Sequence, residues 1–175
     1  MAPLLESRNH AWLRQYKLEC MRHDGGFRHG SAAMAIRLEH ANVSVRDIKG
    51  MIRFLQTAFP EFRMRGEGIS REGAQWVHVG TDDTYIALSE SRVEPGSFRP
   101  YSGAPGVNHL AYIVDDVEAL RQRLAAAGYK DSTPPNAHPY RKRQYFYDPE
   151  GNDWEFVQYL SSDPAERNDY ELPDR

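Results

Sequence analysis

The sequence predicts a mixed α/β protein of the α+β type, built from two tandem β-α-β-β-β modules. A histidine-to-aspartate segment recurs at a separation of 69 residues (109 − 40 and 116 − 47), from His40 to Asp47 and from His109 to Asp116. Each copy joins a strand-like run to a helical pattern with the aspartate in its N-cap region. Further strand-like runs then follow, which indicates duplicated modules rather than a solenoid.

The first module is predicted at residues 34–90. Its helix begins after Asp47 and ends at Phe59, because Pro60 cannot continue it. Apolar residues recur along this helix at the spacing that forms one face. The strands are expected at 37–45, 62–65, 74–79 and 85–89.

The second module is predicted at residues 107–160. Its helix follows Asp116 and ends at Gly128. A segment rich in Pro and Gly, 91–106, reads as the linker between the modules. The strands are expected at 107–114, in a short piece around Tyr129, at 143–147 and at 154–159, and the flanking segments are an N-terminal appendage, 1–33, and a C-terminal tail, 161–175.

Composition excludes several classes of protein. A net charge of −3 provides no general attraction for nucleic acid or anionic membrane surfaces. A single cysteine, Cys20, excludes intrachain disulfides and thiolate metal cages. No apolar run reaches membrane-spanning length and no signal peptide is recognisable, so we expect a cytoplasmic protein without nucleic-acid or membrane partners.

The run from Tyr145 to Gln158 predicts a hairpin that carries a functional carboxylate. Strand alternation places Trp154 and Phe156 toward a core and Glu155 on the opposite face of the sheet. His40 and His109 occupy equivalent places in the two modules. Two imidazoles and one carboxylate form a facial triad, which leaves coordination positions free for substrate or water.

The repeat also aligns Ala87 with Glu155, so the site is expected to have three ligands and to be open. Mixed nitrogen and oxygen ligands are compatible with one divalent ion of Fe, Mn, Ni, Co or Zn.

From about Ile36 to Leu160, the sequence resembles the vicinal oxygen chelate superfamily. This superfamily includes glyoxalase I, bleomycin-resistance proteins, fosfomycin-modifying thiol transferases and extradiol dioxygenases. The resemblance rests on His40, on the run Asn108 to Asp116, and on the run Tyr145 to Glu155. It implies a divalent metal on His40, His109 and Glu155 that binds substrate through two neighbouring oxygens. Ala87 departs from glyoxalase I, which usually has a glutamate there.

Four further residues are candidates for the chemistry. The resemblance implies that Tyr145 contacts substrate near the metal, and a phenol there can donate a hydrogen bond to an oxyanion. Arg143 either binds an anionic group of the substrate or belongs to a solvated basic edge, which is the interpretation for Arg141 and Lys142. Tyr147 is expected on the same strand face. His138 either resembles a second-sphere histidine of extradiol dioxygenases or is an exposed loop residue.

In the first module, Val77 and Val79 are expected to correspond to this strand face. His78 is expected to match Phe146 and to face away from the metal.

We therefore expect a metal-dependent enzyme that acts on a small substrate with vicinal oxygens, as a lyase or transferase or as a ring-cleaving dioxygenase. The alternative is a metal-free protein that binds and sequesters a small, antibiotic-like molecule. A homodimer is expected, because it would cover exposed strand edges. The modules could pair within one chain or swap between two, in which case His40 would join His109 and Glu155 of the other subunit.

Overall fold

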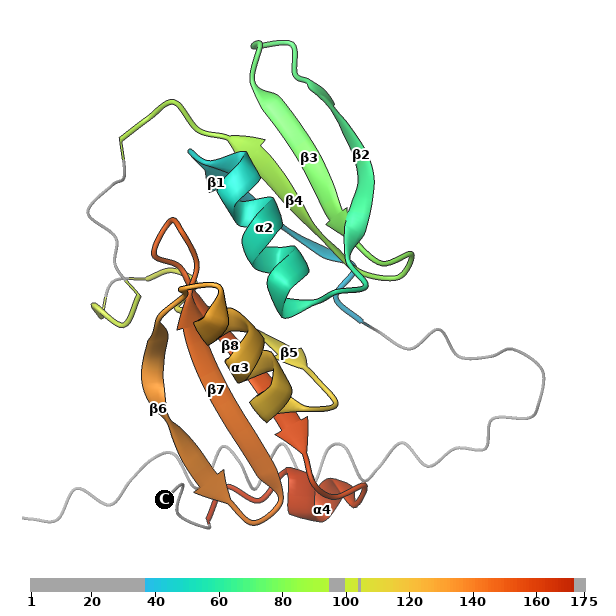
Figure 1. Cartoon of the computed structure of the whole chain (residues 1–175), viewed down its shortest axis with the longest axis vertical. Coiled ribbons are helices and arrows are strands. Elements are labelled where there is room, and N and C mark those ends of the chain that lie inside the picture. Colours follow the sequence, from blue (N-terminus) through green and yellow to red (C-terminus); the bar gives the residue numbers. More distant parts are fainter. Residues whose placement is uncertain (1–36, 95–99, 104, 172–175) are drawn as a thin grey trace, which may run out of the picture. The chain divides into compact units, whose positions relative to one another are not determined.

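The structure, a computed structural model, describes residues 37–94, 100–103 and 105–171, with the backbone alone for 133–137. Arg37–Arg175 forms one compact unit. The strands form two separate four-stranded sheets, each accompanied by a helix (Figure 1). The predicted fold class of two βαβββ modules is confirmed, whereas the predicted appendage 1–33 lies outside the described residues.

The first module has the predicted order of elements with shifted strand ends. Its sheet has the order β1-β4-β3-β2, in which β1 is parallel to β4 and the other neighbours are antiparallel. The elements are β1 (His40–Val45), α2 (Ile48–Ala58), β2 (Arg63–Ile69), β3 (Gln75–Gly80) and β4 (Tyr85–Glu90).

The second module repeats this topology as β5-β8-β7-β6, with β5 parallel to β8. The short strand expected around Tyr129 is instead the longer β6, which begins two residues later. A short helix, α4, lies in the predicted tail. The elements are β5 (His109–Ile113), α3 (Val117–Ala126), β6 (Asp131–His138), β7 (Arg141–Tyr147), β8 (Asp153–Tyr159) and α4 (Pro164–Arg167). Within the described residues, no helix is long and apolar enough to cross a membrane.

Both main helices begin at the predicted aspartates. The Asp47 carboxylate accepts a hydrogen bond from Gly50 N at 2.8 Å, and the Asp116 carboxylate accepts one from Ala119 N at 2.9 Å. A Cβ on Gly50 would lie 2.3 Å from Asp47 Oδ2, so glycine leaves room for this cap. Gly128, at φ +87°, follows the end of α3 in the left-handed region.

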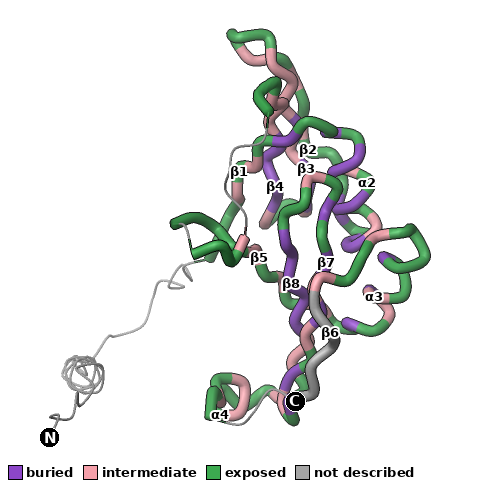
Figure 2. Tube along the Cα trace, turned by 90° about the vertical axis from the view of Figure 1, so that its left-hand side faces the viewer, coloured by how far each residue is buried: buried purple, intermediate pink, exposed green. Residues whose placement is uncertain are grey.

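One hydrophobic core runs through both modules. The helices α2 and α3 contact each other, and each also contacts its own sheet. Phe54 of α2 packs against Trp154 of β8 at 5.8 Å between ring centroids, and Phe59 packs against Tyr112 of β5 at 4.7 Å. Buried residues are concentrated on the inner strands β4 and β8 (Figure 2). The other face of each sheet, here called the open face, points away from the helices.

The strand register identifies which residues share the open face. Ala87 lies opposite His78 just as Glu155 lies opposite Tyr145, so Ala87 is the counterpart of Glu155, as predicted. The same register makes His78, rather than Val77 or Val79, the counterpart of Tyr145, and the predicted match of His78 to Phe146 is wrong. Val77 and Val79 are buried in the core, which turns the residues between and beside them to the open face.

Candidate metal and substrate site

His109 and Glu155 meet on the open face of the second sheet. His109 lies on β5 and Glu155 on the adjacent parallel strand β8. Their Nε2 and Oε2 atoms are 3.1 Å apart, and the side chains are 34% and 9% exposed. The flanking residues Trp154 and Phe156 are buried in the core, so alternation along β8 directs Glu155 to this face as the sequence predicted.

Tyr145 and Arg143 flank this pair from β7. Tyr145 is the cross-strand partner of Glu155, and its ring meets the His109 ring edge-on at 5.8 Å. Burial, followed by the hydrogen bond to the Glu155 carboxylate, raises the pKa of Tyr145 well above its usual value, so the phenol remains a proton donor. Arg143 Nε lies 3.8 Å from Glu155 Oε1. The structure therefore brings together four of the predicted site residues.

Three residues outside the predicted metal ligands and substrate contacts lie around His109. Of these, Tyr101 was expected either to fold over the mouth of the site or to serve packing alone. The Tyr101 hydroxyl lies 3.0 Å from His109 Nδ1 and donates to Asp153 Oδ2 at 2.9 Å. Ser132 donates to the other oxygen of Asp153 at 2.6 Å. Burial, followed by the hydrogen bond to Asp153, raises the pKa of Tyr101 to about 12. For Asp153, the signal in the sequence was its position two residues before Glu155, which alternation places on the same face.

His40 belongs to a different cluster, on the open face of the first sheet. Its ring stacks on Tyr85 at 4.7 Å, and its Nδ1 lies 2.6 Å from Glu39 Oε2. His78 also packs on Tyr85, and Arg65 lies over the same ring at 4.3 Å. Within the described parts of the chain, no group of three His, Cys, Asp or Glu residues is placed to hold a metal ion. One chain thus brings His109 and Glu155 together but does not add His40.

Tyr147 is the last residue of β7, whereas His138 is the last residue of the neighbouring strand β6. Tyr147 lies opposite Asp153 and is 41% exposed, at the rim of the His109 cluster. His138 is 3% exposed on β6 rather than in an exposed loop. It lies five residues beyond Thr133, the strand partner of Tyr145, which corresponds to about 16 Å of strand. His138 Nδ1 accepts from Tyr140 N at 3.2 Å, so the structure does not bring His138 to Tyr145.

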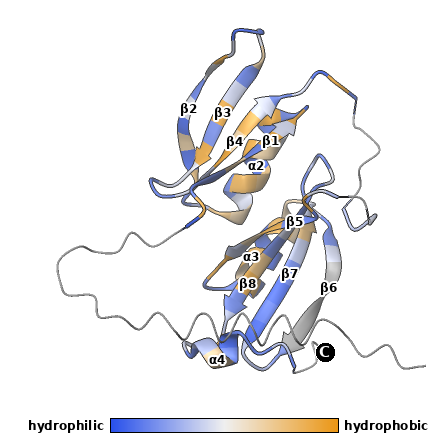
Figure 3. Cartoon of the chain, turned by 180° about the vertical axis from the view of Figure 1, so that it is seen from behind, coloured by the Kyte–Doolittle hydropathy of each residue, from blue (hydrophilic) through white to orange (hydrophobic). Residues whose placement is uncertain are grey.

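The basic residues Arg141 and Arg143, at the start of β7, lie in two different environments. Figure 3 shows this strand as hydrophilic over most of its length. Arg141 is buried and donates to the carbonyls of Arg167 and Asp169. Arg141 therefore anchors the segment after β8, and the interpretation of it as a solvated edge residue is wrong. Arg143 lies on the site face, which favours the interpretation that it binds an anion.

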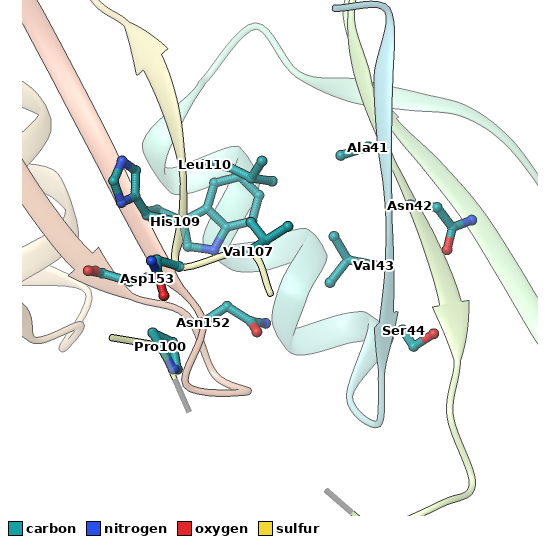
Figure 4. A pocket seen from close by; sticks show the side chains of 12 residues that line it. Ala41, Asn42, Val43, Ser44, Pro100, Val107, His109, Leu110, Asn152 and Asp153 are labelled. Carbon is teal, nitrogen blue, oxygen red and sulfur yellow. The ribbon is translucent and has the colours of Figure 1, made fainter. Parts of the chain in front are cut away.

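A cleft of about 310 Å³ runs along the outer edges of β1 and β5. Ala41 and Val43 point into this cleft, whereas Asn42 and Ser44 point away from it (Figure 4). His109 lies at its border. Each of the two strands has only one described neighbour in its sheet, so their outer edges are accessible beside the metal candidates.

A sequence model of the Glyoxalase/Bleomycin resistance protein/Dioxygenase superfamily matches residues 37–156. No protein with a curated description matches the chain. Among solved structures, a glyoxylase/bleomycin resistance protein/dioxygenase domain from Frankia sp. EAN1pec is similar with a TM-score of 0.61 and 20% identity, over 77% of this chain and 98% of that chain.

Two fosfomycin resistance proteins have similar structures. FosX from Mesorhizobium loti has a TM-score of 0.57 and 24% identity, over 77% of this chain and 98% of that chain. A FosX mutant from Listeria monocytogenes, in complex with Mn(II) and 1S,2S-dihydroxypropylphosphonic acid, has a TM-score of 0.57 and 18% identity. The match covers 78% of this chain and 100% of that chain. At these identities, the similarity demonstrates a shared fold.

Proposed function

Because the chain belongs to the Glyoxalase/Bleomycin resistance protein/Dioxygenase superfamily, that of the vicinal oxygen chelate proteins, we propose that it is a metal-dependent enzyme. Its substrate is a small molecule with two neighbouring oxygens. The reaction is either a redox-neutral lyase or transferase step or the cleavage of an aromatic ring by dioxygen. The observation that carries this proposal is the close approach of His109 Nε2 to Glu155 Oε2 at 3.1 Å on a largely buried surface.

The donor atoms of this pair fit a divalent cation. A neutral imidazole nitrogen and a carboxylate oxygen are both electron-pair donors, so at this separation they repel unless a proton or a cation lies with them. His109 and Glu155 would be two ligands and His40 the third, for one ion of Fe, Mn, Ni, Co or Zn. Such an ion would act as a Lewis acid that stabilises negative charge on the substrate oxygens.

A homodimer supplies the third ligand most simply. In one chain, His40 and His109 lie on the open faces of two different sheets, whereas the shared core lies on the helix side of both. Their side chains are 42% and 34% exposed, so both are accessible to a second copy. We therefore place His40 of one subunit beside His109 and Glu155 of the other. The accessible edges of β1 and β5 favour this pairing, because exposed strand edges are usually covered.

The other residues around Glu155 have separate roles toward the substrate. Tyr145 keeps its phenolic proton and donates a hydrogen bond to the Glu155 carboxylate, and it can redirect this hydrogen bond to a substrate oxyanion. Arg143 is the nearby guanidinium for an anionic substituent. Tyr147, opposite Asp153 at the rim of the His109 cluster, contacts the outer part of the substrate.

The metal content of the purified protein tests this function. Elemental analysis after purification without chelator should find close to one divalent ion per chain, and Glu155→Gln should lose it. Glu61→Gln, at an exposed carboxylate, is the matched control and should keep the metal. Iron would direct substrate screening to catechols under oxygen, and Zn, Ni, Co or Mn would direct it to epoxides and thiol adducts. A wild-type protein that takes up no ion, but binds a small aromatic ligand stoichiometrically, would instead indicate the metal-free binding protein.

A further inference from the structure

Tyr101 links the segment between the modules to the metal candidates. Its hydroxyl lies between two side chains, 3.0 Å from His109 Nδ1 and 2.9 Å from Asp153 Oδ2. A phenol has one proton to donate, and a carboxylate can only accept. The Tyr101 proton is therefore committed to Asp153, and the phenolic oxygen accepts from His109 Nδ1–H.

This arrangement determines which nitrogen of His109 carries the proton. A neutral imidazole has one N–H and one lone pair. If Nδ1 carries the proton, Nε2 presents its lone pair toward Glu155 Oε2, at 3.1 Å. That is the tautomer required of a histidine that ligates a metal through Nε2.

The Asp153 carboxylate is held in place as a hydrogen-bond acceptor. It is 2% exposed, and its second oxygen accepts from Ser132 Oγ at 2.6 Å. A carboxylate is costly to bury unless its oxygens are hydrogen-bonded, and two hydroxyl groups meet that requirement here. Asp153 lies opposite His109 in the parallel register of β5 and β8, so the backbone itself fixes their separation.

Tyr101 is held over His109 by an unusual backbone conformation. Its φ is +61°, and it is the one non-glycine residue in the described part of the chain with a positive φ. A side chain in this region is strained, and the conformation persists only where other contacts maintain it. Tyr101 N donates to Asn108 Oδ1 at 2.8 Å, which provides such a contact next to His109.

Among the described residues of the first module, the carboxylate of this support has no equivalent. In the register of β1 and β4, the place of Asp153 is taken by Tyr85, whose ring stacks on His40. We infer that Tyr101 and Asp153 are positioning residues that hold His109 in the Nδ1–H tautomer with Nε2 free for a metal ion. This inference rests on the proposed metal site. In the metal-free protein Glu155 competes for the proton at Nε2, and Tyr101 keeps that proton on Nδ1 because the Glu155 carboxylate already accepts from Tyr145 and lies beside Arg143.

The test therefore begins with metal-free protein. Long-range ¹⁵N–¹H correlation spectra of the histidine rings in alkaline buffer, assigned with His109→Gln, report which nitrogen is protonated. We expect His109 to show protonated Nδ1 in the wild type and to lose this preference in Tyr101→Phe. Tyr170→Phe, at an exposed tyrosine, should leave the His109 signals unchanged.

Mn(II) affinity, measured by electron paramagnetic resonance of the free ion, provides the second measurement. Tyr101→Phe and Asp153→Asn should weaken binding by about 10- to 100-fold, as expected for groups that orient a metal-ligating histidine. Asp115→Asn, at an exposed carboxylate, is the control for Asp153→Asn. Tyr101 is 56% exposed, so its variant tests the inference even if Asp153→Asn fails to fold.

The possible results distinguish the positioning role of Tyr101 from the existence of the metal site. A wild-type His109 protonated on Nε2, or unchanged tautomer and affinity in Tyr101→Phe, would overturn the positioning role. A wild type that binds no Mn(II) or other divalent ion but shows protonated Nδ1 would refute the metal site and leave the positioning role of Tyr101 intact.

Discussion

Ala87 and Glu155 occupy the same position in two copies of one module, each opposite the open-face residue of the neighbouring antiparallel strand. The methyl group of Ala87 leaves His40 without a carboxylate at the place where His109 has one. The duplication therefore gives one half-site with a carboxylate at this strand position and one in which His40 stacks on Tyr85. Under the proposed function, a second copy of the chain would therefore supply His40 to complete the metal centre.

The contact between the hairpin turn and the first helix should hold the modules together. Glu150 Oε1 accepts from the backbone N–H groups of Arg46 and Asp47, both at 2.8 Å, and its side chain is 12% exposed. Hydrogen bonds to a charged group contribute about 1.5–3 kcal/mol. Glu150→Ala should lower the free energy of unfolding in urea by that amount, and Glu150→Gln, which keeps an acceptor, should lower it less.

Hydrogen exchange locates the effect of this change. In Glu150→Ala, the amides of Arg46 and Asp47 should exchange faster, whereas Glu61→Ala should change neither stability nor exchange. Unchanged protection of both amides in Glu150→Ala would show that Glu150 does not hold this contact.

Asp148 should be the main determinant of the β7–β8 hairpin. It is 5% exposed and accepts from Trp154 Nε1 at 3.0 Å, from Glu150 N at 2.8 Å, and from both the backbone and side-chain nitrogens of Asn152 at 2.9 Å. Asp148→Ala leaves the buried indole N–H without its acceptor, so we expect the free energy of unfolding to fall by about 2–4 kcal/mol. Urea unfolding measures it, with Asp115→Ala as the control. A loss no greater than in that control would contradict this role.

Tyr112 should make stability depend on alkaline pH. Burial raises the pKa of Tyr112 above its usual value of 10.0. The folded state therefore retains the phenolic proton more strongly than the unfolded chain does. This stabilisation is complete below about pH 10 and is lost as the pH rises through the folded-state pKa.

The measurement compares the free energy of unfolding in urea at about pH 8 with that at about pH 11. Wild type should lose more stability across this interval than Tyr112→Phe, and Tyr170→Phe should behave as wild type. Equal losses in wild type and Tyr112→Phe would show that Tyr112 is not responsible.

The sequence predicted the modules because local signals and the repeat agreed. Asp47 and Asp116 marked both helix starts, and alternation around Glu155 identified its face correctly. The strand predicted as a short piece around Tyr129 is the longer β6, although Pro134 and Pro135 lack the N–H groups that a paired strand needs. β6 is an edge strand and its register shifts across these prolines, so the sheet tolerates them.

The site was predicted less completely, because its missing parts depend on contacts between distant segments. His78 was assigned to the wrong face because the separation of equivalent residues falls from 69 at His40 to 67 at His78 (145 − 78), which follows from strand pairing. Tyr101 reaches His109 through a loop conformation that no sequence pattern specifies. His138 was expected to be exposed or catalytic, and it is buried at the far end of β6.

The composite metal site is tested most directly by a heterodimer of two defective chains. His40→Ala and Glu155→Gln subunits, co-expressed with different affinity tags, are isolated as the mixed dimer beside both mutant homodimers. If His40 acts with His109 and Glu155 of the other subunit, the mixed dimer contains one complete site and should bind about one Mn(II) tightly, whereas neither homodimer binds any. A mixed dimer that binds no more Mn(II) than the two homodimers would contradict a metal site shared between subunits.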